Sequence, residues 1–392
     1  MSHSPAGYWS ILGLGALVAL AGAFCIPLLS FFIIDGLQAP PYAVGVFNVS
    51  VAISGMLLSQ WLGGRTDAGW PWRRVLSWAL LAMAIATALL MVCGAFWQAW
   101  LIGITLMALG QAAMPQTLAL ARRFTYAHPQ LGASFSAQVR AAFSLAWIGG
   151  PPLAFYLVAQ GGFASSFLLA TLVSLACLWL VRWGLPNLPA AAPVQPLQEG
   201  QAPLPPGFWG YLLAISCAAV SNSLYVGSLP LYLLHERHLP ATSPGWAMGL
   251  AAGLEIPVML LASRLAGRWG VRSLLWLGSL AGVVFYLALY QADSLWQVLL
   301  CQLANGLFFG LYAGLGILLI QDMVPHRPGF ASACYSNSMR VGGMVGAMLM
   351  GLVASVSDFR SVLLVAAAVL LLGMGCLGLA HWQSQRGQCV PA

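Results

Sequence analysis

The chain has 392 residues, of which 60% are hydrophobic and only 6% are charged. Ordinary soluble domains carry about 45–50% apolar and about 25% charged residues, so this composition excludes a water-soluble enzyme or a nucleic-acid-binding domain. The net charge of +7 does not indicate a nucleic-acid partner, because all 15 basic residues are Arg and none lies in a run longer than two. The protein is expected to lie within a lipid bilayer.

A helix that spans a membrane needs about 20 mostly apolar residues. Twelve such segments can be marked off at charged or Gly/Pro-rich breaks. In chain order the expected spans are Tyr8–Ile34, Ala43–Leu62, Val75–Phe96, Ala99–Ala121, Ser134–Val158, Phe163–Arg182, Phe208–Leu234, Gly245–Ala266, Leu274–Tyr290, Gln297–Ile320, Ala331–Val356 and Ser361–Ala380.

The segment Gly184–Pro206 is rich in Pro and Ala and almost free of charge. Because proline disfavours both helix and sheet, this segment is expected to be a semi-extended linker. We expect an N-terminal six-helix bundle at residues 1–183, a cytoplasmic linker at 184–207 and a C-terminal six-helix bundle at 208–392.

The distribution of Arg residues predicts the orientation. If the N-terminus is cytoplasmic, the outside loops hold only Arg237 and Arg360, Arg140 and Arg340 lie within spans, and all other Arg residues fall on the inside. Such an excess of basic residues in cytoplasmic loops indicates that both termini are cytoplasmic. The chain is expected to cross its membrane many times.

The two halves of the chain repeat each other about 200 residues apart. Trp97-Gln98 opens the fourth span and Trp296-Gln297 the tenth, and Arg140 and Arg340 follow similar Ser/Ala-rich stretches in spans five and eleven. A repeat at the same order in each half implies two related bundles with a site between them. The expected fold class is all-α: a polytopic membrane protein with 12 transmembrane helices in two pseudo-symmetric six-helix bundles.

Two short basic loops carry a resemblance to a known family. GGRTDAGWPWRR (63–74) and SRLAGRWGVR (263–272) resemble the signature loop of the major facilitator superfamily, roughly G-x-L-x-D-R-x-G-R-R. The first copy lacks the Arg after Asp67, and the second has Gly267 where Asp would stand. AMPQTLALAR (113–122), VRAAFSLAWIGGPPLAF (139–155), AAGLEIP (251–257) and QDMVP (321–325) are similar to the bacterial sugar efflux transporters of that superfamily. The resemblance implies export of sugars, glycosides or related polar molecules, in exchange for protons. It also implies that the chain is a multi-pass protein of a bacterial inner membrane.

Three ionisable residues, Arg140, Glu255 and Arg340, lie well inside apolar spans, where a charge is costly and marks a functional site or a buried partner. Glu255 lies about 15 Å into its span and Arg340 about 13 Å into its own. We assign proton coupling to Glu255 and Arg140, while a purely structural salt bridge between Glu255 and Arg340 remains an alternative. Arg140 lies only about 9 Å from the start of its span, so snorkelling or pairing with a loop carboxylate stays open for it.

Uncharged polar side chains inside the spans are candidate sugar contacts, since hydroxyl groups need donors and acceptors and sugar faces stack on aromatic rings. Several pairs lie three residues apart, on one face of a helix. Each of them alone is equally consistent with a hydrogen bond between helices. The substrate-binding candidates are Gln111, Gln116, Gln138, Trp147, Asn222, Tyr225, Gln302, Asn305, Asn337 and Arg340.

Gating is assigned to Asp67, Arg73 and Arg74 in the first signature loop and to Gly150 and Pro151 in span five. Asp67 is suited to dock on the positive N-terminal end of span eleven and to hold the inner side closed. Gly150 allows close helix approach and Pro151 bends the span, a feature that the resemblance links to antiport. An ordinary proline kink is the alternative.

No cofactor or metal is expected, because the eight Cys residues are isolated and lack metal-ligand spacing. The expected partners are a small-molecule substrate, protons and the lipid bilayer, with the protein as a monomer. The nearest alternative function is export of another polar metabolite, drug or metallophore, since Arg340 suits an anion. A membrane receptor or an intramembrane enzyme is a more distant one, and the chain has no H-E-x-x-H or G-x-S-x-G motif.

Overall fold

The computed structural model describes residues 7–67, 69–128, 134–186, 204–325 and 327–388. Within these ranges the chain is helical apart from short connections and contains no strand. Eleven of the described helical ranges are long and apolar enough to cross a membrane. The predicted all-α, polytopic membrane fold is confirmed, while the count of twelve spans stays a prediction.

Backbone contacts divide the chain into two units. Unit 1 comprises Met1–Gln195 and Pro244–Gly249, and unit 2 comprises Pro196–Ser243 and Leu250–Ala392. Most of the expected linker falls on residues 187–203, which lie outside the described residues, and the predicted bundle boundaries remain predictions.

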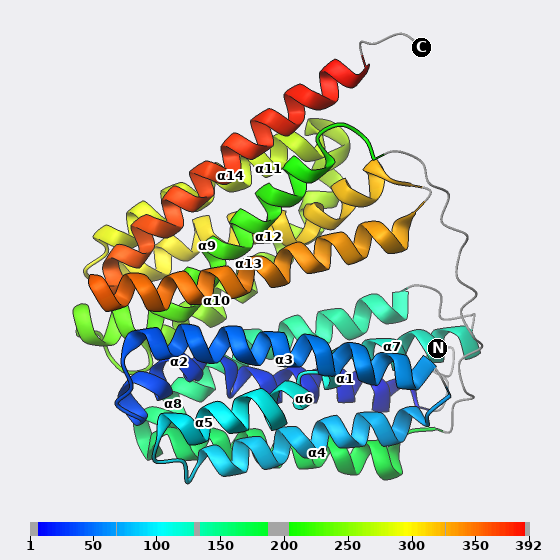
Figure 1. Ribbon diagram of the computed structural model, residues 1–392, viewed down its shortest axis with the longest axis vertical. Helices are drawn as coiled ribbons and strands as arrows, with labels where there is room; N and C mark the ends of the chain where they lie inside the picture. Colours follow the sequence, from blue (N-terminus) through cyan, green and yellow to red (C-terminus); the bar gives the residue numbers. More distant parts are fainter. Residues whose placement is uncertain (1–6, 68, 129–133, 187–203, 326, 389–392) are drawn as a thin grey trace. The chain divides into compact units, whose positions relative to one another are not determined.

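Unit 1 is built around α1 and α8, which pack chiefly on one another, with α4 also against α8 (Figure 1). Its elements are α1 (Tyr8–Ala23), η1 (Ile26–Leu28), α2 (Leu29–Phe31), η2 (Phe32–Gly36), α3 (Pro41–Asp67), α4 (Trp72–Leu90), α5 (Phe96–Ile102), η3 (Gly103–Met107), α6 (Ala108–Gly110), α7 (Ala113–Ala127), α8 (Ser134–Trp179) and η5 (Leu180–Gly184).

The long helix α8 contains the two spans that the sequence predicts between Ser134 and Arg182. The backbone leaves helical geometry at Gly161 and at Gly162, where φ is 69°, a conformation that glycine adopts readily. The 44-residue apolar range Ala141–Gly184 is therefore two helical pieces joined at a glycine pair.

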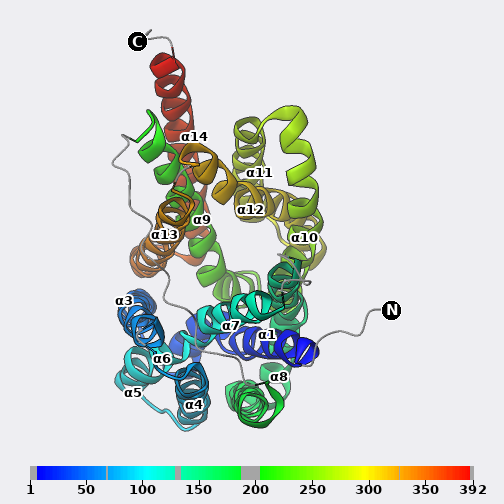
Figure 2. The same ribbon diagram turned by 90° about the vertical axis from the view of Figure 1, so that its right-hand side faces the viewer.

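Unit 2 is organised around α9, which packs on α13 and α14, while α11 packs on α12 and α14. Figure 2 shows several of these helices nearly end-on. The elements are α9 (Phe208–Leu231), η6 (Tyr232–Glu236), α10 (Ser243–Trp269), α11 (Val271–Gln291), α12 (Leu295–Met323), α13 (Pro328–Val356) and α14 (Phe359–Gln388). The helix α10 runs across the division between the two units.

The repeat seen in the sequence recurs in the backbone. The π-helical turns η2 and η6 end corresponding spans, and each is followed by a residue at φ 51°, Gln38 in one half and His238 in the other. The helices α1 and α9 both begin after a glycine in the left-handed conformation, Gly7 at φ 92° and Gly207 at φ 84°. The two units therefore share local turns that a chance resemblance of apolar helices does not produce.

The structure explains the repeated Trp-Gln pair. The side-chain oxygen of Gln98 accepts hydrogen bonds from the backbone N–H groups of Gly94 and Ala95, at 3.0 and 3.2 Å. Gln297 accepts equivalent bonds from Asp293 and Ser294, at 2.8 and 3.2 Å. In both units the glutamine satisfies amide groups at a helix start that lack a partner within the helix.

Charged side chains join three connections at one end of unit 2. The Arg237 guanidinium forms an ion pair with Asp293 and donates to the Tyr290 carbonyl at 2.9 Å. Arg360 donates to the same carbonyl at 2.9 Å, and the Glu236 carboxylate accepts the backbone N–H groups that start α14. The ends of α9, α11 and α14 are thereby held together, although the predicted external side of this end stays a prediction.

Two glycines let α13 approach α9 closely. A Cβ atom at Gly342 would lie 2.5 Å from the Ser216 carbonyl oxygen and 2.6 Å from the Ala219 side chain. A Cβ at the neighbouring Gly343 would meet nothing within 4 Å. Close approach of backbones is the main source of helix association in a membrane, so Gly342 is a packing requirement and Gly343 is not.

We therefore predict that Gly342→Ala lowers the free energy of unfolding by about 1–3 kcal/mol, the usual cost of overpacking. Gly343→Ala is the matched control and should change it by less than about 0.5 kcal/mol. Thermal unfolding of both variants in detergent measures the difference, and equal losses would contradict the packing argument.

Candidate functional site

Glu255 lies in the apolar range Ser243–Ala262 of α10, and its residue is half-buried. Among the described residues it forms no hydrogen bond or ion pair, and it is not paired with Arg340. The structure therefore gives no support to a salt bridge between Glu255 and Arg340.

A row of glycines on α12 brings the Glu255 turn of α10 close. A Cβ at Gly306 would lie 2.6 Å from that of Leu254, and one at Gly310 would lie 2.8 Å from the Val258 side chain and 3.2 Å from the Glu255 carbonyl oxygen. The glycines are four residues apart and so share one face of α12. They place the carboxylate-bearing turn directly against this helix.

Three of the predicted substrate contacts form one buried hydrogen-bonded group. The Tyr225 hydroxyl and the Asn305 amide both donate to the side-chain oxygen of Gln302, each at 3.0 Å. The Gln302 amide donates to the Val298 carbonyl at 3.1 Å. Gln302 is 0% exposed and the other two are 2% exposed, while the Asn305 side-chain oxygen has no hydrogen-bond partner in the described part of the chain. We call Tyr225, Gln302 and Asn305 the polar triad.

The other predicted substrate contacts of unit 2 are more accessible. Asn337 and Arg340 are exposed, one turn apart on α13, and neither has a hydrogen-bond partner among the described residues. Asn222, on α9, is half-buried. The free donors of Asn337 and Arg340 suit them to contact a ligand, whereas the polar triad already satisfies most of its own groups.

In unit 1 the most suitable polar candidate is Gln111. It lies at a turn where the fourth span is interrupted, after the π-helical segment η3. Its side chain is exposed and its amide oxygen lies 3.1 Å from the Cβ position of Gly55 on α3. Breaks and π-turns inside a span free backbone groups and often mark functional positions.

The remaining candidates of unit 1 are dispersed. Gln138 accepts a hydrogen bond from the Tyr8 hydroxyl, and Gln116 and Trp147 are half-buried. Arg140 lies on α8, but its side chain falls outside the described part of the structure.

The gating candidates lie in different surroundings, and their gating role stays a prediction. Arg73 donates to the carbonyls of Arg182 and Leu185, the former at 3.3 Å, and thus binds the end of span six within unit 1. Arg74 is exposed, and Asp67 ends α3 with its side chain outside the described residues. Gly150 and the buried Pro151 lie on α8 where a Cβ at Gly150 would collide with Ala23, the last residue of α1.

The interruption of the first span after α1 was not predicted from the sequence. The helix stops at Ala23, and the Phe24 carbonyl accepts a hydrogen bond at 2.9 Å from Ser166, a fully buried residue of α8. The break lies opposite the Gly150–Pro151 segment. Pro27, which cannot donate a backbone hydrogen bond, was the available sequence signal for this interruption.

Comparison with known proteins decides the family. Residues 211–387 match the model of the Major Facilitator Superfamily. The chain is 35% identical to sugar efflux transporter A of Dickeya chrysanthemi, over 94% of each chain, and 34% identical to sugar efflux transporter B of Salmonella typhimurium, over 92% of each. The chain belongs to the sugar efflux transporter family of the major facilitator superfamily.

Solved structures agree on the fold of this sugar efflux family member. A bacterial homolog of the human lysosomal transporter Spinster has a TM-score of 0.80 at 14% identity, with 98% of both chains covered. The nucleoside transporter NupG has a TM-score of 0.77 at 16% identity, covering 95% of this chain and 98% of its own. Membership of the sugar efflux transporter family makes the chain a multi-pass membrane transporter of the bacterial inner membrane, and not an enzyme.

The hydrogen bonds of the polar triad predict a contrast between two variants. Gln302→Leu leaves the Tyr225 hydroxyl and the Asn305 amide without an acceptor, and should lower the free energy of unfolding by about 1–3 kcal/mol. Tyr225→Phe removes a single bond and should cost about 0.6 kcal/mol, the average in membrane proteins. Thermal unfolding in detergent measures both, with Asn337→Ala as the control at an unpartnered position. A smaller loss for Gln302→Leu than for Tyr225→Phe is the outcome that contradicts this account.

Proposed function

We propose that this transporter exports sugars or glycosides in exchange for protons, by opening its substrate site alternately to the two sides of the membrane. The choice of sugar is supported by relatives of at least 34% identity that are named sugar efflux transporters and align over most of the chain. The gating role of Asp67, Arg73, Arg74, Gly150 and Pro151, the cytoplasmic location of both termini and the monomeric state belong to the same proposal.

Proton exchange is supported by the surroundings of Glu255, which offer its charge no partner among the described residues. An ionised carboxylate within an apolar span is costly, and among the residues that the structure describes Glu255 has no ion pair or hydrogen bond that compensates for it. Protonation removes this cost, so a change in the surroundings of Glu255 between two conformations would bind and release a proton. Arg140 is the second residue assigned to this coupling.

The energy of one proton suffices for concentrative export. A proton that moves down roughly 100 mV and one pH unit yields about 3.7 kcal/mol. That amount supports a sugar gradient of several hundred-fold, so a single carboxylate is adequate for a one-to-one exchange.

Substrate contacts are proposed on both units. In unit 2, Asn337 and Arg340 offer free polar groups to a ligand, and Asn222 with the polar triad lies on the neighbouring helices α9 and α12. In unit 1 the proposed contacts are Gln111, Gln116, Gln138 and Trp147. Together they supply the mixture of amide groups and aromatic surface that suits sugar hydroxyl groups and sugar faces.

One observation favours a second candidate function. Arg340 is an exposed cation inside the apolar range Phe330–Val356, with no anionic partner among the described residues. A neutral sugar does not require this charge, whereas an anionic metabolite, drug or metallophore would be attracted by it. A substrate screen that includes anionic metabolites beside neutral sugars separates the two.

We predict that Glu255→Gln abolishes transport driven by a pH gradient and leaves exchange of labelled for unlabelled sugar intact, because glutamine imitates the protonated acid. The measurement uses the purified full chain in vesicles, a panel of labelled mono- and disaccharides, and an imposed gradient of one pH unit. Asp293→Asn, at an exposed carboxylate, is the control and should retain both activities. Persistence of pH-driven transport in Glu255→Gln would overturn the assignment of Glu255, and absence of sugar transport in the unaltered protein would overturn the choice of substrate.

A further inference from the structure

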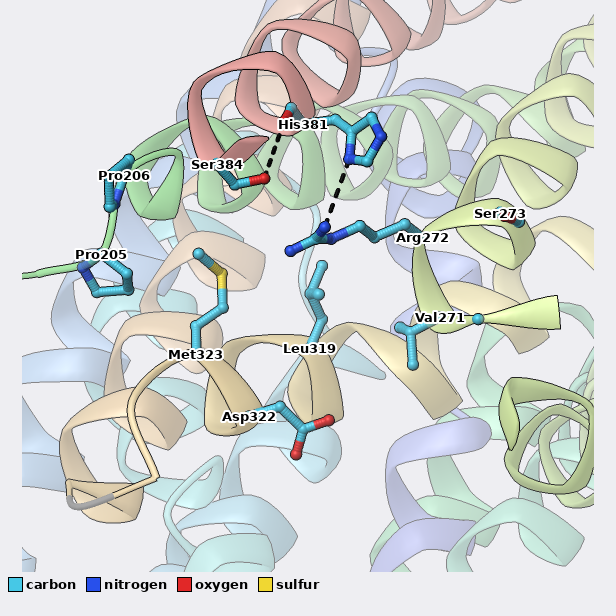
Figure 3. A pocket seen from close by; sticks show the side chains of 11 residues that line it. Pro205, Pro206, Val271, Arg272, Ser273, Leu319, Asp322, Met323, His381 and Ser384 are labelled. Atoms are coloured by element: carbon cyan, nitrogen blue, oxygen red, sulfur yellow. Dashed lines mark hydrogen bonds between the residues drawn. The ribbon is translucent and has the colours of Figure 1, made fainter. Parts of the chain in front are cut away.

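Unit 2 contains a cavity of about 620 Å³ that the transport proposal does not use. Its walls come from the segment before α9, the start of α11 and the ends of α12 and α14 (Figure 3). In this view the Arg272 guanidinium lies inside the cavity, with His381 above it and Leu319 below it. Known ligand sites have volumes of about 300–1,000 Å³. The space around Arg272, which we call the Arg272 cavity, is therefore large enough to hold a small ligand.

The Arg272 guanidinium is held from two sides and has no acidic partner among the described residues. Its Nη1 atom lies 3.4 Å from Nδ1 of His381 on α14, and its central carbon lies 5.6 Å from the centre of the Tyr211 ring on α9. Asp322 is the one carboxylate among the lining residues, and it points away from the guanidinium across α12 (Figure 3). A guanidinium has five N–H donors. Most of those of Arg272 have no acceptor in the described part of the chain.

The arginine at the same place in unit 1 has its acceptors in the fold. Arg73 and Arg272 are each the second residue of a helix, α4 and α11. Arg73 donates to the carbonyls of Arg182 and Leu185, where span six ends and its last carbonyls have no partner within the helix. In unit 2 the last helix, α14, continues to Gln388, so its carbonyls beside Arg272 are bonded within the helix. The donors that stabilise unit 1 therefore lack that role in unit 2.

Side-chain size at the helix start contributes to the cavity. Trp72 is the first residue of α4 and is buried in an apolar cluster. Val271 is the first residue of α11 and lines the Arg272 cavity. A valine is much smaller than a tryptophan, so the start of α11 leaves room where the start of α4 is packed.

The cavity lies at the level where spans end. Apolar ranges that contribute to it begin at Phe208 and Val271 and end at Met323. Trp209 and Trp269, next to two of these ends in the sequence, are 65% and 60% exposed. Tryptophan is enriched at the membrane–water interface, so the cavity is at the depth of lipid phosphate groups and is also close to water.

We propose that the Arg272 cavity binds a phosphate group, which comes either from a phospholipid head group or from a soluble phosphate ester. The fork of N–H groups on a guanidinium donates two parallel hydrogen bonds to phosphate oxygens. The apolar side chains of Val271, Leu319 and Met323 suit the carbon skeleton attached to the phosphate. Glu255 and the polar triad do not line this cavity, so the binding is separate from the proposed transport site.

Two probes distinguish the sources of the phosphate. Native mass spectrometry of the detergent-purified full chain compares dioleoyl phosphatidylglycerol with dioleoylglycerol, which has the same acyl chains and no phosphate. Isothermal titration calorimetry measures the binding of glycerol 3-phosphate. Preference for phosphatidylglycerol over dioleoylglycerol that glycerol 3-phosphate does not reduce assigns the site to a lipid. Binding of glycerol 3-phosphate assigns it to a soluble ester. Absence of both overturns the proposal.

Arginine variants then assign the binding to the cavity. Arg272→Gln should weaken the phosphate probe that binds by about tenfold and leave dioleoylglycerol unaffected. Arg272→Lys should give an intermediate affinity, because lysine keeps the charge without the fork. Arg268→Gln, at an exposed arginine of the same loop that does not line the cavity, is the matched control and should bind as the unaltered protein does. Unchanged binding in Arg272→Gln, or an equal loss in Arg268→Gln, overturns the proposal.

Ser273→Glu tests the same cavity without removing Arg272 from its contacts with His381 and Tyr211. Ser273 is exposed, lines the cavity and lies in the first turn of α11. A carboxylate in a first turn stabilises a helix, while here it repels a phosphate, so phosphate binding should fall without loss of thermal stability. If Arg272→Gln fails to fold, this variant decides: phosphate binding that remains unchanged in Ser273→Glu overturns the proposal.

Discussion

The rest of the structure depends on one constraint: inside a bilayer, every backbone N–H and C=O group must find a partner in the protein. Helices meet this constraint over most of the described chain. Where a helix is interrupted, side chains must bond to the backbone groups that lose their partners. Ser166 donates to the Phe24 carbonyl where α1 stops, and Ser165 donates to the Gly162 and Leu157 carbonyls at the break in α8. The Tyr232 hydroxyl donates to the Leu289 carbonyl at the end of α11. Hydroxyl-bearing side chains thus satisfy backbone carbonyls where spans bend or end.

The two units satisfy this constraint with the same turns and helix caps, and they differ in the side chains around them. The π-turns, the left-handed glycines and the glutamine caps recur at matching positions, because each stabilises a turn or a helix start whatever the surrounding side chains are. The side chains around them are freer to differ. A packed tryptophan in unit 1 becomes Val271 in unit 2, and an arginine that binds carbonyls becomes one that faces a cavity. The two units therefore keep the same turns and helix starts while their side-chain packing differs.

The sequence predicted the helical fold and the repeat well, because apolar length and spacing are properties of the chain alone. The break between spans five and six lies at Gly161–Gly162, close to the boundary expected from the same glycines. Other features depend on contacts between distant segments and were not predictable. Gln302 and Asn305 were recognised as polar residues of one helix face, but their complete burial follows from the packing of α9 and α12. The cavity at Arg272 likewise results from the size of residues that lie far apart in the sequence.

The scarcity of charge gives the structure its most useful signal for function. Of the charged residues that the structure describes, Arg73, Arg237, Arg360 and Glu236 bond to backbone groups or to one another, and each stabilises the end of a helix. Others have no such role: Glu255 and Arg340 lie within spans without an ion pair among the described residues. In a chain that is 6% charged, a charge that stabilises no contact of the fold retains its cost of desolvation. Such a cost is offset when the charge binds something that the isolated chain lacks, and for Glu255 and Arg340 we infer a proton and a substrate respectively.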